Sequence, residues 1–565
     1  MKAKTLSSLR WISKTAGKSK LWVLLMALVR VLQACIALMY ATTLQKVVDS
    51  AAAGQRADFT SMFFAFLAVV LASLLLLVLA RYLFDKATVE MEKAYRSHVF
   101  SQLLHREYET VDSTHSGDWL TRIDSDVSVV VSAVVRIIPD LSGHLLRITL
   151  VLVFLIQTIP IIVYIIVPTA LVVGVGSLFF RERMKQMHKY VQEANAHMRG
   201  TVQERLGSLG VIHAFTQETN TTRQINGTLD ACAKSKMKRS LFVNLCSSSL
   251  SMGLFAAQAI GIGLCCWNII QGNMTYGTMS AVLYLINQLE GPLINISSYI
   301  SQSYAMLASA ERLIEIEKLP HDSQGPEVSA EQAKEYYEQD FSSIRLQNAC
   351  FAYRNKPDNM IVHGLDLEVH KGEFVCFTGE SGCGKSTAMK LLLNLYPLHS
   401  GSLHLISKDG SSQALHTGWR SLFAYVPQGN HLFSGTLRET LAFADPAIIK
   451  QDERMWNALQ IACAEDFVRD LPQGLDTVLG ERGSGLSEGQ MQRIAIARAI
   501  LSQRPILLLD ECTSALDNET EYMLLKNLRS MTNCTVLTIT HRPAALEFCD
   551  RKIEFYSTQE DKQTV

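Results

Sequence analysis

The sequence has little charge and no excess of either sign. Charged residues make up 19% of its 565 positions and apolar residues 48%, a low charged fraction for a soluble protein. Basic and acidic residues number 53 each, so the composition gives no indication of binding to nucleic acid or another polyanion. No acidic residue occurs from Met1 to Val48. The length is too great for one compact domain, and we expect at least two folding units.

The cysteines lack the spacing of a metal site. Of the twelve, only Cys265 and Cys266 are close neighbours, and both fall in an apolar segment. Seven lie after residue 340, where a disulfide framework is not expected. A reducing compartment fits best, with the cysteines, Cys383 among them, acting as small apolar fillers.

Long hydrophobic runs are concentrated in the first 300 residues. Each of six runs is near the ~20 residues that cross a bilayer as a helix. The first contains one charge, Arg30, which disfavours the alternative of buried helices in a large soluble core. We predict six transmembrane helices, at residues 21–44, 60–84, 138–158, 161–180, 246–270 and 278–300.

Basic residues are absent from some links between these runs and abundant in others. The links 159–160 and 271–277 have none, whereas the first twenty positions hold six and residues 181–240 hold eleven. Because basic residues stay on the inner side of a membrane, both termini and the links 85–137 and 181–245 are expected inside.

The two long inner links mix polar and apolar residues without the alternation of a strand. We expect helices that continue beyond the membrane to turns near Tyr108–Gly117 and Val211–Gln217. The first apolar run is too long for a signal core, so no cleavable signal peptide is expected. The basic amino terminus could mimic an organelle transit peptide, but we favour a short amphipathic helix along the inner membrane surface.

The composition changes after Pro320. Residues 321–340 are polar and acidic and contain serine, glycine and proline, which predicts a linker. Short strand-like runs then begin at 344–346, 365–369 and 374–377. The expected architecture is therefore a membrane domain over 1–320, the linker, and an α/β domain over 341–565.

The third of these strands leads into a complete phosphate-binding loop. The loop is Gly379-Glu380-Ser381-Gly382-Cys383-Gly384-Lys385-Ser386, and a helix follows from Thr387. Its glycines allow backbone N–H groups to surround a phosphate. Lys385 would neutralise the β- and γ-phosphates, and the Ser386 hydroxyl can ligate Mg²⁺. The loop alone predicts binding of a triphosphate together with Mg²⁺.

A fully apolar strand at 506–509 ends in two acids. Asp510 is placed to reach Mg²⁺, usually through water, and Glu511 to polarise an attacking water. Two solvated carboxylates are the structural alternative, which the neighbouring motifs disfavour.

The run Leu486-Ser487-Glu488-Gly489-Gln490 opens a helix over 492–501. Locally it is a capping box, in which Ser487 caps the helix and Gln490 bonds back. The free N–H groups and dipole at such a helix start also favour an anion. We call residues 486–490 the signature run.

This run, together with the phosphate loop and the acidic strand end, resembles the ABC ATPases. Residues 341–565 look like the nucleotide-binding domain of an ABC transporter, and 1–320 look like the six-helix membrane domain of the ABC exporters. The fold class implied is an all-α polytopic membrane domain followed by an α/β P-loop ATPase domain. The family usually has glycine where this chain has Glu488.

The resemblance also implies roles for individual residues. Tyr353 would stack on adenine, although an ordinary strand aromatic remains the alternative. Gln428 would touch Mg²⁺ and relay to the membrane domain, and His541 would contact the γ-phosphate. Ser514-Ala515-Leu516-Asp517, the coupling loop, would connect two ATP sites. Ser487, Gly489 and Gln490 would close over the γ-phosphate held by a second subunit, which requires a dimer.

The membrane half shows the same resemblance. Three groups of residues match the exporter pattern near its two inner turns and at the end of its sixth helix. They are Ser116-Gly117-Asp118 with Arg122 and Asp126, then Glu204-Arg205-Leu206 through Glu218, then Ala308-Ser309-Ala310-Glu311-Arg312.

The expected function is ATP-driven export of a hydrophobic or amphipathic substrate such as a lipid, peptide or drug. The expected place is the inner (plasma) membrane, with the ATPase in the cytoplasm. A homodimer is expected, and a heterodimer with a related half-transporter stays open. An importer with the exporter fold and an ATP-gated membrane regulator also stay open, whereas a soluble DNA-repair ATPase is excluded by the membrane half. No nucleic-acid partner is expected.

Two further expectations concern charged side chains. A carboxylate at the first position of a helix stabilises it by ~0.3–1 kcal/mol. A carboxylate aimed at the γ-phosphate would repel it, so we expect Glu488 to point away and only Ser487 and Gly489 to approach ATP. Ionisable residues within membrane spans are candidates for substrate binding, although snorkelling or interhelical pairing is an equal alternative. They are Arg30, His144, Arg147 and Glu290.

Overall fold

The computed structural model describes residues 2–114, 116–322, 325–429, 432–480, 483–531, 534–540 and 542–556. Side chains are not described at 2–4, 161–182, 185 and scattered positions between 246 and 297 and at 543–544. The chain divides into two compact units, which we describe separately. The first contains residues 1–101 and 117–317, and the second contains 102–116 and 318–565.

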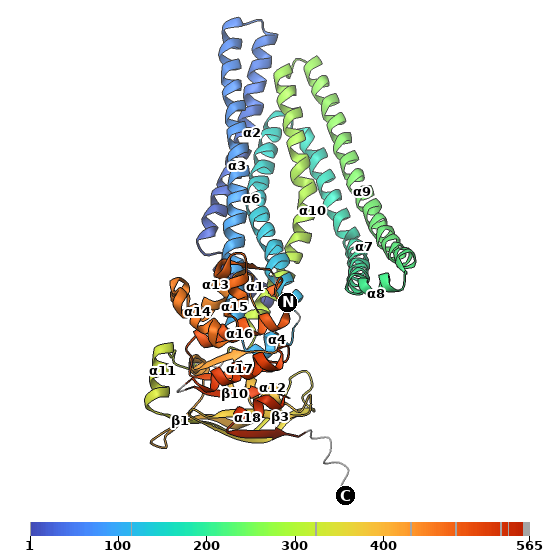
Figure 1. Ribbon diagram of the computed structural model, residues 1–565. Helices are drawn as coiled ribbons and strands as arrows, with labels where there is room; N and C mark the ends of the chain where they lie inside the picture. Colours follow the sequence, from blue (N-terminus) through green and yellow to red (C-terminus); the bar gives the residue numbers. More distant parts are fainter. Residues whose placement is uncertain are drawn as a thin grey trace. The chain divides into compact units, whose positions relative to one another are not determined.

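Six long helices make up most of the first unit (Figure 1), and each predicted apolar run lies within one of them. They are α2 (Lys20–Ala52), α3 (Arg56–Leu104), α6 (Val127–Thr158), α7 (Pro160–Gly207), α9 (Glu218–Ile270) and α10 (Tyr276–Lys318). Among the described residues, three stretches are long and apolar enough to cross a membrane: 5–52, 56–104 and 116–158. Single residues can separate these helices, since only Ile159 lies between α6 and α7, and Pro160 begins the latter.

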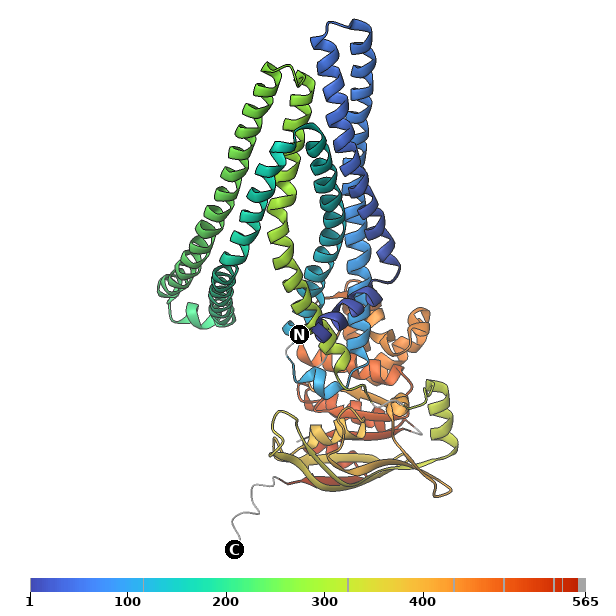
Figure 2. The same ribbon diagram turned by 180° about the vertical axis from the view of Figure 1, so that it is seen from behind.

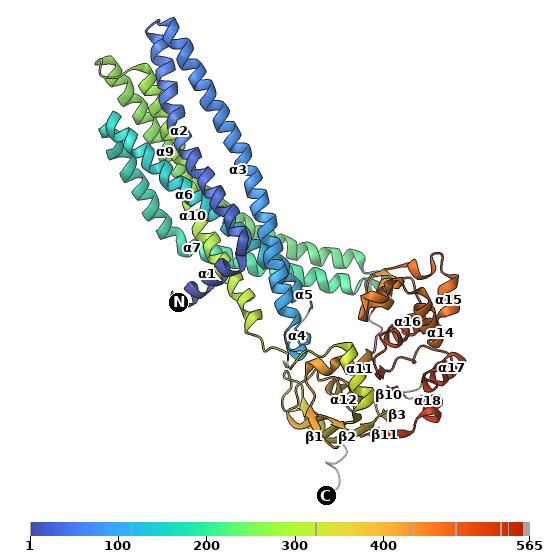
Figure 3. The same ribbon diagram turned by 90° about the vertical axis from the view of Figure 1, so that its left-hand side faces the viewer.

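The helices continue well beyond a bilayer, as the inner links predict. α3 has 49 residues, α7 has 48 and α9 has 53, which at ~1.5 Å per residue is more than twice the ~30 Å hydrocarbon core. α7 and α9 lie side by side, and the short α8 (Leu209–Ala214) joins their ends (Figure 2). α2 and α3 also run as a pair (Figure 3). The turns lie where the sequence predicts them, at α8 and at α4 (Tyr108–Asp112).

The amino terminus forms α1 (Lys2–Ala16), which is the expected short helix. Its Trp11 is buried, and the indole Nε1 donates to Glu317 Oε1 at 2.6 Å. The Tyr95 hydroxyl of α3 donates to the Ile12 carbonyl at 2.5 Å. These contacts attach α1 to the long helices of the same unit. Another short helix, α5 (Ser116–Thr121), precedes a π-helical turn at Arg122–Asp126.

The second unit is built on a five-stranded parallel sheet in the order β11-β3-β10-β9-β6. Its strands are β11 (Arg551–Phe555), β3 (Phe374–Gly379), β10 (Thr535–Ile539), β9 (Ile506–Asp510) and β6 (Phe423–Val426). All five residues of β9 are buried, which confirms the prediction of a central strand. The carboxyl ends of β3, β9 and β6 lie at one edge, where the phosphate loop and the two acids follow.

A second, antiparallel sheet has the order β2-β1-β4-β5. Its strands are β1 (Phe341–Ala352), β2 (Met360–His370), β4 (Ser400–Ser407) and β5 (Ser412–Ala414), and a short pair is formed by β7 (Gly435–Thr436) and β8 (Val478–Leu479). The helices are α12 (Lys385–Leu392), α13 (Leu437–Leu441), α14 (Asp452–Ile461), α15 (Glu465–Asp470), α16 (Glu488–Leu501), α17 (Asn518–Arg529) and α18 (Pro543–Phe548).

The predicted linker at 321–340 contains a helix. α11 (Ala330–Gln339) begins with a capping box between Ser329 and Gln332, and it buries Ala333 and Tyr337 against the α/β core. The polar composition concealed a short amphipathic helix with one buried side.

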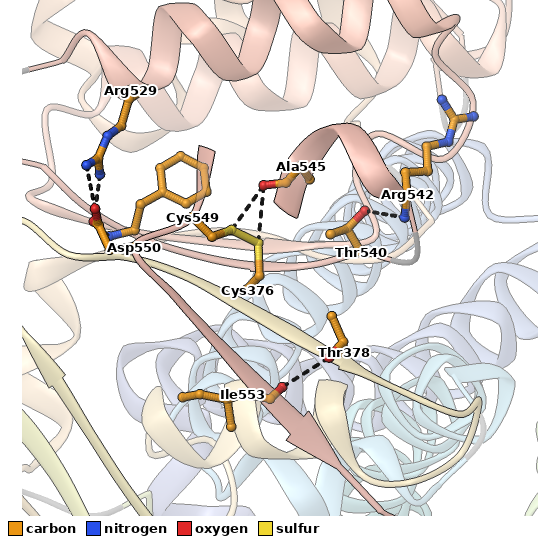
Figure 4. Close-up of a disulfide and its surroundings, with 10 residues drawn as sticks. Cys376, Thr378, Arg529, Thr540, Arg542, Ala545, Cys549, Asp550 and Ile553 are labelled. Carbon is orange, nitrogen blue, oxygen red and sulfur yellow. Dashed lines mark hydrogen bonds and ion pairs between the residues drawn. A yellow bond between two sulfur atoms is a disulfide. The ribbon is translucent and has the colours of Figure 1, made fainter. Parts of the chain in front are cut away.

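The expectation that the cysteines of the ATPase region are only fillers is wrong for one pair. Cys376 of β3 and Cys549, which follows α18, form a disulfide across 173 residues of sequence (Figure 4). Next to it Asp550 accepts a backbone hydrogen bond from Phe374 at 2.8 Å and forms an ion pair with Arg529 at 2.5 Å. The Arg529 guanidinium holds the pKa of the Asp550 carboxyl below its ordinary value. Cys383, by contrast, is a free and buried thiol, as expected of a filler.

Candidate functional site

The phosphate loop has the backbone that its glycines predict. Gly379, Gly382 and Gly384 have φ values of 130°, 86° and 99°, which side chains rarely adopt. A Cβ at Gly379 would lie 2.2 Å from the Phe555 carbonyl oxygen, so the loop can follow this course only with glycine there. The Lys385 ammonium is buried and donates to the carbonyls of Gly379 and Glu380 at 2.7 and 2.6 Å. The loop thus surrounds a lysine charge at the start of α12.

Asp510 lies directly beside this loop. Its carboxylate accepts from the Ser386 hydroxyl at 2.9 Å and from the Tyr425 hydroxyl at 3.2 Å. Burial raises the pKa of the Asp510 carboxyl, and the two hydrogen bonds oppose that shift. A hydroxyl and a carboxylate at this spacing are the oxygen donors that Mg²⁺ prefers.

Glu511 faces Gln428 across the same sheet edge. The Gln428 Nε2 donates to Glu511 Oε2 at 2.7 Å. Glu511 has a φ of +50°, an uncommon value for a residue with a side chain. The backbone therefore turns sharply after Asp510, so that the two neighbouring acids have different partners.

Tyr353 lies close to the helix that follows the loop. Its hydroxyl is 3.2 Å from the Thr387 hydroxyl, and its half-buried ring packs edge-on against Phe351 and Tyr396. The structure thus brings Tyr353, the loop, Asp510, Glu511 and Gln428 into one group. His541 lies outside the described residues.

The signature run belongs to a separate group. The capping box is confirmed, because Gln490 N donates to Ser487 Oγ at 3.3 Å and Ser487 N donates to Gln490 Oε1 at 2.9 Å. Gly489 packs against the coupling loop, where a Cβ would lie 2.8 Å from the Ala515 carbonyl oxygen. Ser487 and Glu488 are exposed. One chain therefore presents two different surfaces, a phosphate loop with two acids and an exposed capped helix start.

Comparison with known proteins agrees with this arrangement. The family model of the ABC transporter transmembrane region matches residues 23–293, and the ABC transporter model matches residues 362–514. The chain belongs to the ABC transporters. Both expected parts, a helical membrane domain and an α/β ATPase domain, are confirmed, and ATP hydrolysis in this ABC transporter is coupled to transport.

Its relatives are similar along most of its length. The mitochondrial ATP-dependent permease MDL1 of Saccharomyces cerevisiae is 27% identical over 468 residues, which cover 81% of this chain and 66% of the permease. The multidrug resistance ABC transporter ATP-binding and permease protein of Lactococcus lactis subsp. cremoris is 27% identical over 469 residues, covering 81% and 76%. A bacterial Atm1-family ABC exporter with ATP bound has the same fold. Its TM-score is 0.78 at 22% identity, covering 96% of this chain and 94% of that chain.

Sequence reasoning about this ABC transporter missed the support of the coupling loop. Arg542 donates to the carbonyls of Ser514 and Leu516 at 2.7 and 2.6 Å, and it pairs with Glu521 at 3.1 Å. Glu521 is buried and also accepts from the Thr513 hydroxyl at 2.7 Å. A charged residue beside His541 was visible in the sequence, but its partner on α17 was not.

The sequence also did not indicate the ion pairs that join residues 102–116, which begin at the end of the long helix α3, to the ATPase fold. Arg354, which follows Tyr353, pairs with Glu107 at 2.7 Å and with Glu109 at 3.5 Å. Its backbone N–H donates to Glu109 at 2.8 Å, and its guanidinium donates to the Thr110 hydroxyl at 2.8 Å. The turn at α4 is therefore fixed to the residue beside the expected adenine contact.

Within the membrane unit, two groups noted in the sequence meet each other. The buried Asp126 accepts from the Ser309 hydroxyl at 3.0 Å and from the Arg312 Nε at 2.8 Å. Charge-assisted bonds of this kind connect the start of α6 to the end of α10.

Proposed function

We propose that two copies of this chain form an exporter that hydrolyses ATP at two shared sites and moves a hydrophobic or amphipathic substrate outward across the inner or plasma membrane. The observation that carries this proposal is the division of the site into two groups. The phosphate loop, Asp510 and Glu511 form one surface, and the exposed signature run of the same chain forms another. Two identical chains related by a two-fold axis would complete two equivalent sites, because each phosphate loop would face the signature run of the other chain.

The residues in these groups support individual roles. Glu511 is the expected general base, and its hydrogen bond from Gln428 would orient it toward an attacking water. Lys385 would exchange its two carbonyl partners for phosphate oxygens. Gly379 to Thr387 would cradle the phosphates, and Tyr353 would stack on the adenine.

The donors present fit Mg²⁺. Ser386, Asp510 and Gln428 offer a hydroxyl, a buried carboxylate and an amide oxygen, all hard oxygen ligands. Bound there, Mg²⁺ would neutralise charge on the phosphates. His541 keeps its proposed contact with the γ-phosphate.

A Glu511→Gln exchange tests the chemistry. The amide cannot accept a proton, so we expect ATP binding to persist while turnover falls by at least ~100-fold. Nucleotide binding and phosphate release would be measured on the full chain in nanodiscs. Undiminished hydrolysis would remove Glu511 from its role.

The assembly and direction need their own measurements. Native mass spectrometry of the purified protein should give twice the chain mass. Accumulation in inside-out vesicles should require ATP. A stable monomer, or ATP-driven loss of substrate from such vesicles, would contradict the homodimeric exporter.

A further inference from the structure

Two adjoining cavities in the membrane unit are lined with arginine. One of about 370 Å³ lies among α2, α3 and α6, and another of about 220 Å³ lies among α2, α6 and α10. The first falls within the ~300–1,000 Å³ usual for ligand pockets. Both are lined by Arg30 and Asp140, so they adjoin at this pair. The ionised side chains lining the two are Arg30, Arg81, Arg136, Arg147, Asp85 and Asp140.

Arg30 and Asp140 neutralise each other. The Arg30 Nε lies 3.0 Å from Asp140 Oδ1, and the Tyr299 hydroxyl donates to Asp140 Oδ2 at 3.1 Å. Close packing of α2 on α6 positions this pair, because a Cβ at Gly143 would lie 2.9 Å from the Arg30 Cβ. The Asp140 carboxylate is therefore already committed to one arginine.

Arg147 has a neutral neighbour. It lies near the middle of the predicted span 138–158, and its Nη1 donates to the Gln288 side-chain oxygen at 3.1 Å. Its Nε is buried and has no hydrogen-bond partner within the part of the chain that the structure describes. Glu290 lies two residues beyond Gln288, a spacing that places it on the other side of α10. Burying a charged guanidinium within the membrane span costs free energy when its partner is a neutral amide. Binding of an anion beside Arg147 would offset that cost.

The larger cavity also has an apolar wall. Met26 of α2 and Leu77, Ala80 and Phe84 of α3 line it beside the charged side chains of the same helices. A ligand that fills both cavities would need an acidic group to contact the arginines and a hydrocarbon part to contact the apolar side chains.

We propose that the adjoining cavities bind an amphipathic anion, with Arg147 contacting a phosphate or similar acidic group in the smaller cavity and Arg136 adding positive charge at the larger one. This inference rests on the proposed export function and narrows its substrate class. The predicted substrate is an acidic lipid or another acidic amphiphile.

Direct binding tests the inference without relying on transport. The full chain in phosphatidylcholine nanodiscs would be titrated calorimetrically with dihexanoyl phosphatidic acid, dihexanoyl phosphatidylcholine and glycerol 3-phosphate. We expect saturable binding of the phosphatidic acid, at least ~10-fold tighter than the other two, since a charge-assisted contact and apolar burial both contribute. Equal binding of the two lipids would overturn the anion site. Equal binding of glycerol 3-phosphate would overturn the apolar part.

Variants assign the effect to the arginines. We expect Arg147→Gln to weaken binding of the phosphatidic acid by ~10-fold or more, and the same loss for Arg136→Gln at an exposed residue. Arg147→Lys should cause an intermediate loss of affinity. The matched control is Arg223→Gln, which removes an exposed charge on α9 away from the cavities. Unchanged affinity in both cavity variants would overturn the proposal. ATP hydrolysis measured in parallel separates this outcome from failure of the proposed exporter.

Discussion

Arg354 offers the sharpest test of how nucleotide binding reaches the membrane half. Its guanidinium contacts Glu107 and Glu109, whose side chains are only 12% and 5% exposed, and the arginine itself is 50% exposed. Removing one partner of a fully buried ion pair costs ~3–5 kcal/mol, but solvent reaches this arginine and screens part of the interaction. The backbone hydrogen bond to Glu109 also survives a side-chain exchange. We therefore expect Arg354→Ala to weaken docking of α4 by ~1–3 kcal/mol.

Hydrogen exchange of residues 102–116 measures this docking directly. A change of that size corresponds to faster exchange by ~5–150-fold when reclosing is faster than chemical exchange, because the exchange rate then follows the opening equilibrium. Arg354→Lys keeps the charge but loses the planar fork, so an intermediate value is expected. ATP binding should persist, while ATP-driven transport should fall more than hydrolysis does.

A matched control is available on β1, the strand that precedes Arg354. Arg345 of β1 forms a similar pair with Glu368 at 2.9 Å and is 39% exposed. Arg345→Ala should leave exchange in 102–116 unchanged. The reasoning is refuted if Arg354→Ala also leaves it unchanged, or if both variants accelerate it equally.

Three further outcomes are expected. Arg542→Ala removes the charged partner of the buried Glu521 carboxylate, which keeps its hydrogen bond from Thr513, and should lower the free energy of unfolding by ~2–4 kcal/mol, measured by denaturant titration, with Glu521→Gln less harmful; equal stability would contradict this role. Peptide mapping without reductant should recover Cys376 joined to Cys549, and Cys549→Ser should lower stability by ~2–4 kcal/mol; unlinked peptides would exclude the bond. Glu488→Gly should change ATP-driven dimerisation and turnover by less than ~5-fold, since only a helix-dipole contribution is lost; a sharp rise in both would identify Glu488 as a brake.

The parts of this protein that the sequence predicts are those encoded by neighbouring residues. The apolar runs predict the long helices, and the five-residue signature run predicts the capping box between Ser487 and Gln490. α11 had the same local signal, since Gln332 follows Ser329 by three residues, and composition alone was given too much weight.

The parts that escaped prediction depend on distant pairings. The disulfide arises because β3 and the end of α18 meet across 173 residues, and Arg354 meets Glu107 only because residues 102–116 form part of the second unit. No single-sequence pattern specifies either encounter. The coupling-loop support has the same origin, because Glu521 and Arg542 lie on different elements.

Two adjacent residues of the signature run differ in the substitutions that the fold tolerates. At Gly489 any Cβ would press on the Ala515 carbonyl at 2.8 Å, whereas Glu488 beside it is exposed. Folding therefore restricts position 489 to the smallest residue and accepts many side chains at 488. A library randomised over both positions and selected only for folded protein should recover glycine at 489 and a broad mixture at 488. Substitutions at position 488 can therefore change the charge beside the nucleotide site at little cost in stability. In this chain the residue at that position is an acidic one.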